Sequence, residues 1–413
     1  MQYIATTSDG ATLTFALETL PEAFARVPDP RRKQGRRYSV AAILSLAVVA
    51  ILANHTSVLA MAEWAERQTG HVRRALGFRR VTSPHQTTIQ RLLARLDPAA
   101  VAAAVERVFE PCVPGEVRPR GSQGVALDGK AQRGRLRHGA TPTHPIHAVS
   151  AFCHDLGGVL AQVVVDAQQH EAELTVAPEA IGQIDWQGRV LTGDALYCQQ
   201  TLCRQVVEAG GEYLLIVKEN QPTLLADIQQ LFAPLTEEER NRSGVHSVQP
   251  LVCQTAQTVE KGHGRIEERQ IRVSSELAGY SSWPYLAQVF AYTRRWTSKG
   301  VRKQQMRYGI TSLPSDVSDA AQLAALKRGH WQVENGLHHV KDVTLGEDAS
   351  QTHVGNAADV LAMVRNTAIS LIRRAGHRDI AASLRRYSGC PHEALALLGI
   401  RGVENASALD AIG

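Results

Sequence analysis

Cysteine is scarce in this chain of 413 residues, and so are aromatic side chains. The six cysteines include no Cys-x-x-Cys pair, and Phe, Trp and Tyr together make up 5% of the residues. A long chain with so few, scattered cysteines does not depend on a dense disulfide framework, and it lacks the commonest zinc-binding spacings. We therefore expect reduced and mostly buried thiols.

An export signal and a long hydrophobic run are also lacking. The first ten residues contain neither the charged start nor the apolar stretch of a signal peptide. The longest apolar run, from Val40 to Ala53, is interrupted by Ser45 and is too short to cross a bilayer. These features predict a cytoplasmic protein without a membrane partner.

The net charge of +5 hides an uneven distribution. Residues 21–140 hold 20 Lys and Arg against 9 Asp and Glu, whereas the rest of the chain holds 25 against 31. A basic front segment joined to an acidic remainder fits a nucleic-acid partner. An ordinary basic protein with a solvated charged face would give the same count.

Hydrophobic periodicity indicates a helical front part. Residues 16–110 include an apolar helix over 41–53, an amphipathic helix over 58–67 and a helix that opens at Ser83-Pro84. The last one places polar and basic side chains opposite Ile89, Leu92 and Leu93, which suits either a helix presented to DNA or an ordinary bundle helix. Residues 111–121, rich in Pro, Gly and Arg, mark a domain boundary.

The pattern then changes to short strands in the order βββ-α-β-α-β. Strands are expected over 125–127, 147–153, 159–166, 190–191 and 213–217. This order predicts a mixed sheet with flanking helices rather than repeated βαβ units. Residues 221–318 are predicted to be a β-rich insertion, in which a helix over 224–232 is followed by strands. Helical periodicity resumes over 320–339 and 356–372.

Three acidic residues form a candidate metal site. Asp128 and Asp194 each end a short apolar strand pattern, where open α/β sheets bind ligands, and Glu334 lies in a later helical pattern. Such carboxylates could hold the divalent ions that phosphodiester chemistry uses. The chain has 40 acidic residues, so helix caps and surface ion pairs explain the same pattern.

Basic residues surround the glutamate. His330, Glu334, His338 and Lys341 stand at i, i+4, i+8 and i+11, which places them on one face of a continuous α-helix. A carboxylate flanked by basic groups suits an acid that meets both metal and phosphate. A zinc site made of His330, Glu334 and His338 is the rival interpretation, although no His-Glu-x-x-His motif supports it.

Other basic and polar residues are candidate DNA contacts. Those just after Asp128 could line a phosphate track or a solvated loop, and the later ones could contact DNA or form turns. They are Lys130, Arg133, Arg135 and Arg137, then Lys218, Asn220 and Gln221, and finally His263 and Arg265.

Several motifs together resemble those of bacterial insertion-sequence transposases of the DDE type, in the ISAs branch of H-repeat-associated proteins. The resemblance runs over nearly the whole chain. It rests on Asp29-Pro30-Arg31-Arg32, Leu127-Asp128-Gly129-Lys130, Thr192-Gly193-Asp194-Ala195, Val217-Lys218-Glu219-Asn220-Gln221, His330-Trp331-Gln332-Val333-Glu334-Asn335 and Glu347-Asp348.

The resemblance implies an RNase H-like core and a catalytic site in which Asp128, Asp194 and Glu334 hold Mg²⁺, with Mn²⁺ as a substitute. It implies an enzyme that cuts the terminal inverted repeats of a DNA element and joins the freed 3′-hydroxyl to target DNA. A homodimer is expected, because two ends must be joined in one event. Arg31, Arg32 and Arg36 become DNA contacts of the front part, together with His330, His338 and Lys341 near the glutamate.

The sequence departs from the wider group at two positions. That group has a Tyr-x₂-Arg-x₃-Glu-x₆-Lys signature, which Lys341 completes here, but Lys327 and His330 replace its Tyr and Arg. Relatives with a β-rich insertion hold a flipped base beside a tryptophan, for which Trp283 and Trp296 are candidates.

The expected fold class is α/β, with an RNase H-like mixed sheet, flanking helices, a β-rich insertion and an N-terminal helical domain. The expected division is a helical DNA-binding domain over 1–115, the core over 120–220, the insertion over 221–318, the rest of the core with the glutamate over 319–375 and a helical tail over 376–413. Two alternatives stay open. One is a transposase-derived DNA-binding protein without catalysis, and the other is a metal-dependent nuclease without strand transfer.

Overall fold

The computed structural model describes residues 2–6, 12–16, 18–79, 82–109, 118–132, 146–165, 172–233, 251–262, 265–298, 301–352 and 354–401. The chain divides into two compact units. The first unit comprises residues 1–117, 129–180 and 332–413, and the second comprises residues 118–128 and 181–331. Strand β3 (Gln123–Gln132) crosses the division, because Gln123–Asp128 belongs to the second unit and Gly129–Gln132 to the first.

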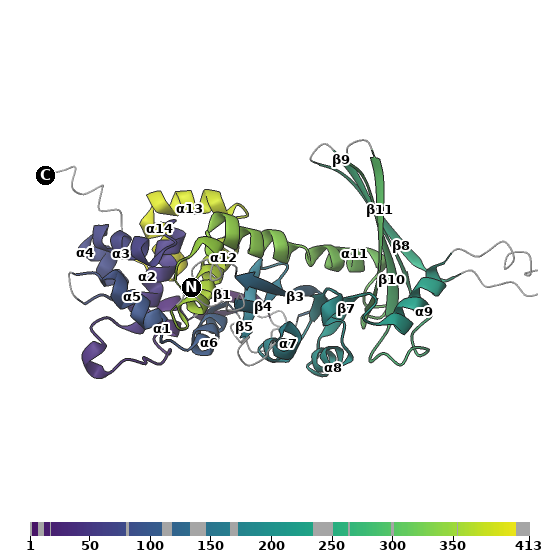
Figure 1. Cartoon of the computed structure of the whole chain (residues 1–413), viewed down its shortest axis with the longest axis horizontal. Helices are drawn as coiled ribbons and strands as arrows, with labels where there is room; N and C mark the ends of the chain where they lie inside the picture. Colours follow the sequence, from purple (N-terminus) through teal and green to yellow (C-terminus); the bar gives the residue numbers. More distant parts are fainter. Residues whose placement is uncertain are drawn as a thin grey trace, which may run out of the picture. The chain divides into compact units, whose positions relative to one another are not determined.

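The first unit is largely helical (Figure 1). It contains the antiparallel pair β1 (Gln2–Thr6) and β2 (Thr12–Ala16) and the strands β4 (Ile146–Cys153) and β5 (Gly158–Val165). Its helices are α1 (Leu20–Phe24), α2 (Val40–Leu52), α3 (Val58–Arg67), α4 (Gly70–Ala75), α5 (Gln86–Leu93), α6 (Pro98–Phe109), most of α7 (Glu173–Gly182), α12 (Ala357–Arg374), α13 (Ile380–Gly389) and α14 (Pro391–Leu397).

Helices α2 and α12 form the centre of this unit. All residues of α2 except Ala41 are buried, and the Ser39 hydroxyl caps its start by accepting the N–H of Ala42. Helix α12 packs against α2, α6 and β5. By length and composition Lys33–Leu52 could cross a membrane, but 72% of its most apolar window is buried in the structure. The run is therefore a core helix of the first unit.

Helix α5 begins later than the sequence predicts. The helix starts at Gln86 rather than at Ser83-Pro84, because the His85 side chain accepts the N–H of Thr87 and caps it. Pro84 therefore precedes the helix instead of occupying its first turn. The predicted core face is confirmed, since Ile89, Leu92 and Leu93 are buried.

The larger sheet has nine strands in the order β5-β4-β3-β6-β7-β11-β10-β9-β8. Strands β3, β6 (Arg189–Gly193) and β7 (Glu212–Val217) are parallel, while β4 and β5 form an antiparallel hairpin. Helices α8 (Gln200–Glu208) and α9 (Pro222–Phe232) follow β6 and β7. This arrangement confirms the mixed sheet of an RNase H-like core.

The β-rich insertion continues the core sheet instead of forming a separate one. Its strands β8 (Gln254–Gly262), β9 (Arg265–Ser274), β10 (Gln288–Ser298) and β11 (Val301–Thr311) are successively antiparallel. Tyr308–Thr311 of β11 pairs with Leu214–Val217 of β7. Gly309 is needed at this junction, because a Cβ there would collide with the Phe290 ring and the Leu215 carbonyl oxygen.

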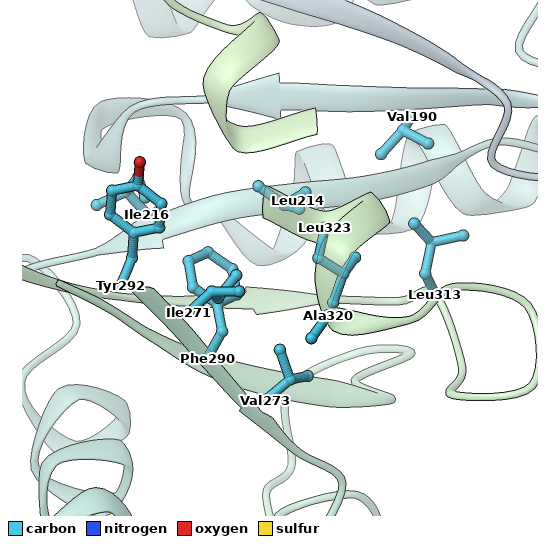
Figure 2. Packing of buried hydrophobic residues seen from close by; sticks show 10 residues of the cluster. All are labelled: Val190, Leu214, Ile216, Ile271, Val273, Phe290, Tyr292, Leu313, Ala320 and Leu323. Carbon is cyan, nitrogen blue, oxygen red and sulfur yellow. The ribbon is translucent and has the colours of Figure 1, made fainter. Parts of the chain in front are cut away.

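Within the second unit, a hydrophobic cluster joins the insertion to the core strands (Figure 2). Val190 and Leu214 of the core strands pack with Phe290 of the insertion and with Leu323 of α11 (Ala320–Gly329). Asp319 begins α11 with a capping box that includes Gln322. None of the cysteines that the structure describes forms a disulfide, and Cys153, Cys198 and Cys203 are buried as expected.

The helix that carries Glu334 differs from its prediction. Helix α11 ends at Gly329, and two π-helical segments follow, η5 (Glu334–His338) and η6 (Val340–Thr344). The Glu334 carbonyl accepts the N–H of His339, which is the i→i+5 bond of a widened turn. The prediction that His330, Glu334, His338 and Lys341 share one face of an α-helix is therefore wrong, because the α-helical period of 3.6 residues is interrupted at Glu334 and again at Val340.

Candidate active site

Asp128 and Asp194 lie level with each other in the second unit. Gln123–Ala126 of β3 pairs in parallel with Arg189–Thr192 of β6, and Asp128 and Asp194 each stand two residues beyond the last paired positions. The backbone of Asp194 is still extended. Side chains at matched positions of parallel strands point to the same face of the sheet. Both carboxylates are partly exposed. Asp194 directly follows the end of β6, but β3 continues past Asp128 to Gln132, so the prediction that Asp128 ends its strand is wrong.

Asp194 is held by the turn that it begins. Its Oδ1 accepts the N–H of Leu196 at 2.8 Å and caps a short 3₁₀ helix, η4 (Ala195–Tyr197). Two side chains from the end of β7 brace this turn. Asn220 Nδ2 donates to the Ala195 carbonyl at 2.7 Å, and Gln221 Nε2 donates to the Cys198 carbonyl at 3.0 Å.

His330 and Lys327 lie in the same unit as Asp194. His330 Nδ1 is 3.3 Å from Thr192 Oγ1, and burial lowers the pKa of His330 to about 4 although the Asp194 carboxylate opposes the change. Lys327 Nζ lies 3.9 Å from the centre of the Tyr292 ring, and burial lowers the pKa of Lys327 to about 7, with a further contribution from Arg307. His330 is therefore neutral at pH 7, unlike the arginine that it replaces in the wider group.

Glu334 belongs to the first unit. Its side chain is 57% exposed, and one of its oxygens lies 3.7 Å from Nδ1 of the buried His338. Burial, followed by the nearby charges of Lys341 and Lys130, lowers the pKa of His338 to about 3. A neutral His338 offers no positive charge to a phosphate.

Lys130 and Lys341, both predicted DNA contacts, lie instead in a buried ion cluster of the first unit. Lys341 Nζ is 3.2 Å and Lys130 Nζ is 4.0 Å from Glu347 Oε2, while Arg365 lies 3.6 Å from Glu347 Oε1. Lys130 also donates to Asp342. Sequence reasoning assigned no role to Glu347 or Arg365, although Glu347-Asp348 was one of the motifs that carried the resemblance.

The other predicted site residues are spread over both units. Arg31 pairs with Asp29 at 2.9 Å, Arg36 lies 3.6 Å from the same carboxylate, and Arg32 and Lys218 are exposed. Trp283 is buried, and the Arg294 guanidinium lies 4.8 Å from the Trp296 ring centre. Arg133, Arg135, Arg137 and His263 lie outside the described residues, and Arg265 begins β9 but its side chain lies outside them too.

Comparison with known proteins places this chain in a family. Residues 119–371 match the family described as "Transposase DDE domain", and residues 21–108 match the one described as "DDE_Tnp_1-associated". The chain therefore belongs to the DDE transposases, as the sequence motifs predicted, and a protein named as H repeat-associated is among those it is similar to.

Three relatives illustrate the similarity. The chain is 28% identical to "Putative transposase YncI" of Escherichia coli O157:H7, over 90% of this chain and 91% of that protein. It is 27% identical to "H repeat-associated putative transposase YhhI" of Escherichia coli K12, over 90% and 94%. It is 31% identical to "Uncharacterized protein in dhlA 3'region" of Xanthobacter autotrophicus, over 71% and 94%.

A solved structure of the piggyBac transposase synaptic complex with hairpin DNA aligns with 95% of this chain and 82% of its own. The TM-score is 0.40 and the sequence identity is 9%. These values are too low to bear on function.

Proposed function

We propose that this transposase cleaves DNA at the ends of a mobile element and transfers the freed 3′-hydroxyl to target DNA, using divalent metal ions held by Asp128, Asp194 and Glu334. The matched position of Asp128 and Asp194 on neighbouring parallel strands carries the proposal. One of these short carboxylates lies within β3 and the other directly follows β6, and carboxylate oxygens are the hard ligands that Mg²⁺ and Mn²⁺ prefer. Glu334 supplies the third carboxylate from a half-exposed helical turn.

The donor set fits the expected ions. When bound, a pair of such ions stabilises the attacking and leaving oxygens of an in-line phosphoryl displacement. The protein residues fix the carboxylates beforehand. Asp194 is oriented by the N–H of Leu196, and its turn is braced by Asn220 and Gln221. His330 is neutral at pH 7 and lies within hydrogen-bond distance of Thr192. It therefore places no imidazolium near Asp194 that would compete with a metal ion.

Duplex DNA is the proposed partner, both as terminal inverted repeats and as target. The front segment, residues 1–115, serves as the DNA-binding domain, because residues 21–140 carry the excess of Lys and Arg. Within it, Arg32 and Arg36 are exposed, although the Arg36 guanidinium already lies 3.6 Å from the Asp29 carboxylate. A homodimer in a paired-end complex, working in the cytoplasm, completes the proposal, since both element ends must be joined to one target.

A cleavage and strand-transfer assay tests this function. Labelled duplexes that carry the inverted repeats flanking the gene are incubated with the protein and Mg²⁺, either intact or with the 3′ end already cut. We expect cleavage and joined products from the wild type and neither from Asp128→Asn, Asp194→Asn or Glu334→Gln, with DNA affinity retained. Glu393→Gln, which removes the partly exposed carboxylate that pairs with Arg386, is the matched control.

Two results would replace the proposal. Cleavage without joined products, even from a pre-cut end, would indicate a nuclease without strand transfer. Specific binding of the repeats with no cleavage in Mg²⁺ or Mn²⁺ would indicate a transposase-derived DNA-binding protein.

A further inference from the structure

Glu347 is the most deeply enclosed carboxylate of the described ion pairs, since its side chain is 2% exposed. Three cations face it from three different elements of the first unit. Lys130 comes from the end of β3, Lys341 from the π-helical segment η6 and Arg365 from the middle of α12. The side chains of Lys130, Lys341 and Arg365 are themselves between 3% and 8% exposed.

The charges of this cluster depend on the one carboxylate. Burial would raise the pKa of Glu347, but Lys341, Arg365 and Lys130 together hold it below its usual range, so Glu347 is ionised. Asp342 is a second carboxylate, but it is 33% exposed and contacts only Lys130 among the three cations in the described contacts. Without Glu347, Lys341 and Arg365 would be buried cations that repel each other, which is a strongly unfavourable arrangement.

Two of the three segments joined at Glu347 lead back to predicted catalytic acids. Lys130 follows Asp128 by two residues in the same strand, and Lys341 follows Glu334 by seven residues in the same helical stretch. Gly346, with a φ of 62°, provides the left-handed turn that introduces Glu347. π-helical turns are rare and are frequently found at functional sites, and the ion pair of Lys341 with Glu347 holds the second of these turns.

We infer that Glu347 is a positioning residue that sets Glu334 for metal binding, by tying its π-helical stretch through Lys341 to the strand end at Lys130 and to α12 at Arg365. This inference rests on the proposed metal role of Glu334. Glu347 itself is enclosed by the three cations and is not a metal ligand. Its effect reaches the metal only through the backbone that carries Glu334.

Glu347→Gln tests this inference in the full-length protein, because it removes the charge and keeps the shape. Mn²⁺ binding is measured by calorimetry, DNA-end affinity by anisotropy, and cleavage as a function of Mg²⁺ concentration. We expect Mn²⁺ affinity to fall by about 10-fold or more, as it does when a group that orients a metal ligand is lost. The Mg²⁺ concentration for half-maximal cleavage should rise by a similar factor, while DNA-end affinity stays within about twofold, because phosphate contacts lie elsewhere. Glu393→Gln should change none of the three.

Lys341→Met keeps the inference falsifiable if Glu347→Gln does not fold. It removes one cation and leaves Glu347 paired with Arg365 and Lys130, so no buried cation loses its partner. The ion pair between Glu347 and the π-helical stretch is lost. The same loss of Mn²⁺ affinity is expected. A thermal melt of each variant establishes that folded protein is compared.

The outcomes separate the inference from the proposed function. A folded Glu347→Gln or Lys341→Met protein with wild-type Mn²⁺ affinity and wild-type Mg²⁺ dependence would overturn the positioning role, even if its melting temperature is lower, and would leave the function intact. If Glu334→Gln binds Mn²⁺ as tightly as the wild type does, both the positioning role of Glu347 and the proposed metal role of Glu334 are overturned.

Discussion

Nδ1 of His330 lies 3.3 Å from Oγ1 of Thr192, two residues before Asp194. Burial keeps this imidazole neutral, with a pKa near 4 in the folded protein against the usual 6.5. The unfolded chain therefore binds more protons than the folded one between these two pH values. The stability that His330 contributes is full above about pH 6.5 and is lost as the pH falls toward 4.

We expect the melting temperature to fall steadily from pH 7.5 to pH 5, with His338 acting in the same direction because its pKa is lowered to about 3. For His330 the loss at pH 5 is about 2 kcal/mol. His330→Gln cannot take up the proton, so the slope of its melting temperature against pH should be shallower than that of the wild type. An unchanged slope would show that His330 is not buried as a neutral group.

Gly309 is expected to be intolerant of any side chain. Gly309→Ala places a Cβ against Phe290 and the Leu215 carbonyl, at the seam between β11 and β7, and should destabilise the protein by about 2–4 kcal/mol in chemical denaturation. Gly70→Ala is the control, because nothing lies within 4 Å of its added Cβ. Equal stability of the two variants would argue against the insertion being continuous with the core sheet.

Asn220→Ala distinguishes a bracing role from the DNA contact that its motif suggested. Loss of its hydrogen bond to Ala195 should loosen the turn after Asp194, lower stability by about 1 kcal/mol and slow cleavage. DNA-end affinity should stay unchanged. The exposed neighbour Glu219, replaced by Ala, serves as the control. Normal cleavage at saturating DNA combined with weaker DNA binding would restore the contact interpretation.

Arg32 and Arg36 are expected to bind phosphates of the element end. Replacing both with Gln should reduce the slope of log affinity against log salt by about 1 to 2, because each phosphate contact releases about one counterion and Arg36 already lies near Asp29. Arg26→Gln removes a cation that is already paired with Glu18, and it should leave the slope nearly unchanged. If both proteins keep the wild-type slope, the DNA contacts lie outside this part of the chain.

The sequence predicted the fold well where local patterns decide it. The apolar helix at Val40–Leu52 and the βββ-α-β-α-β order follow from hydrophobic periodicity. The family followed from motifs. The joining of β11 to β7 was not predictable, because a period-2 pattern does not say which strand is the neighbour.

The missed parts of the site depend on tertiary packing. The period of the helix around Glu334 was taken as 3.6, and nothing in the local sequence indicates that its turns widen at Glu334 and Val340. Lys130 was expected at the DNA because it closely follows Asp128, and Lys341 because it follows Glu334 and completes the signature of the wider group. Their burial depends on Glu347 and Arg365, and only the folded chain brings these four side chains together.

A change of metal preference at Asp194 tests the central claim most directly. In Asp194→Cys a thiolate replaces the carboxylate, and sulfur is a poor ligand for Mg²⁺ but a good one for softer ions. Cleavage of the element-end duplex is measured in Mg²⁺, Mn²⁺ and Cd²⁺, with Asp194→Ala as the control that no ion restores. A metal site at Asp194 predicts that the cysteine variant is inactive in Mg²⁺ and regains cleavage in Mn²⁺ or Cd²⁺. Wild-type cleavage by this variant in Mg²⁺, or inactivity in all three ions, would contradict the metal site at Asp128 and Asp194.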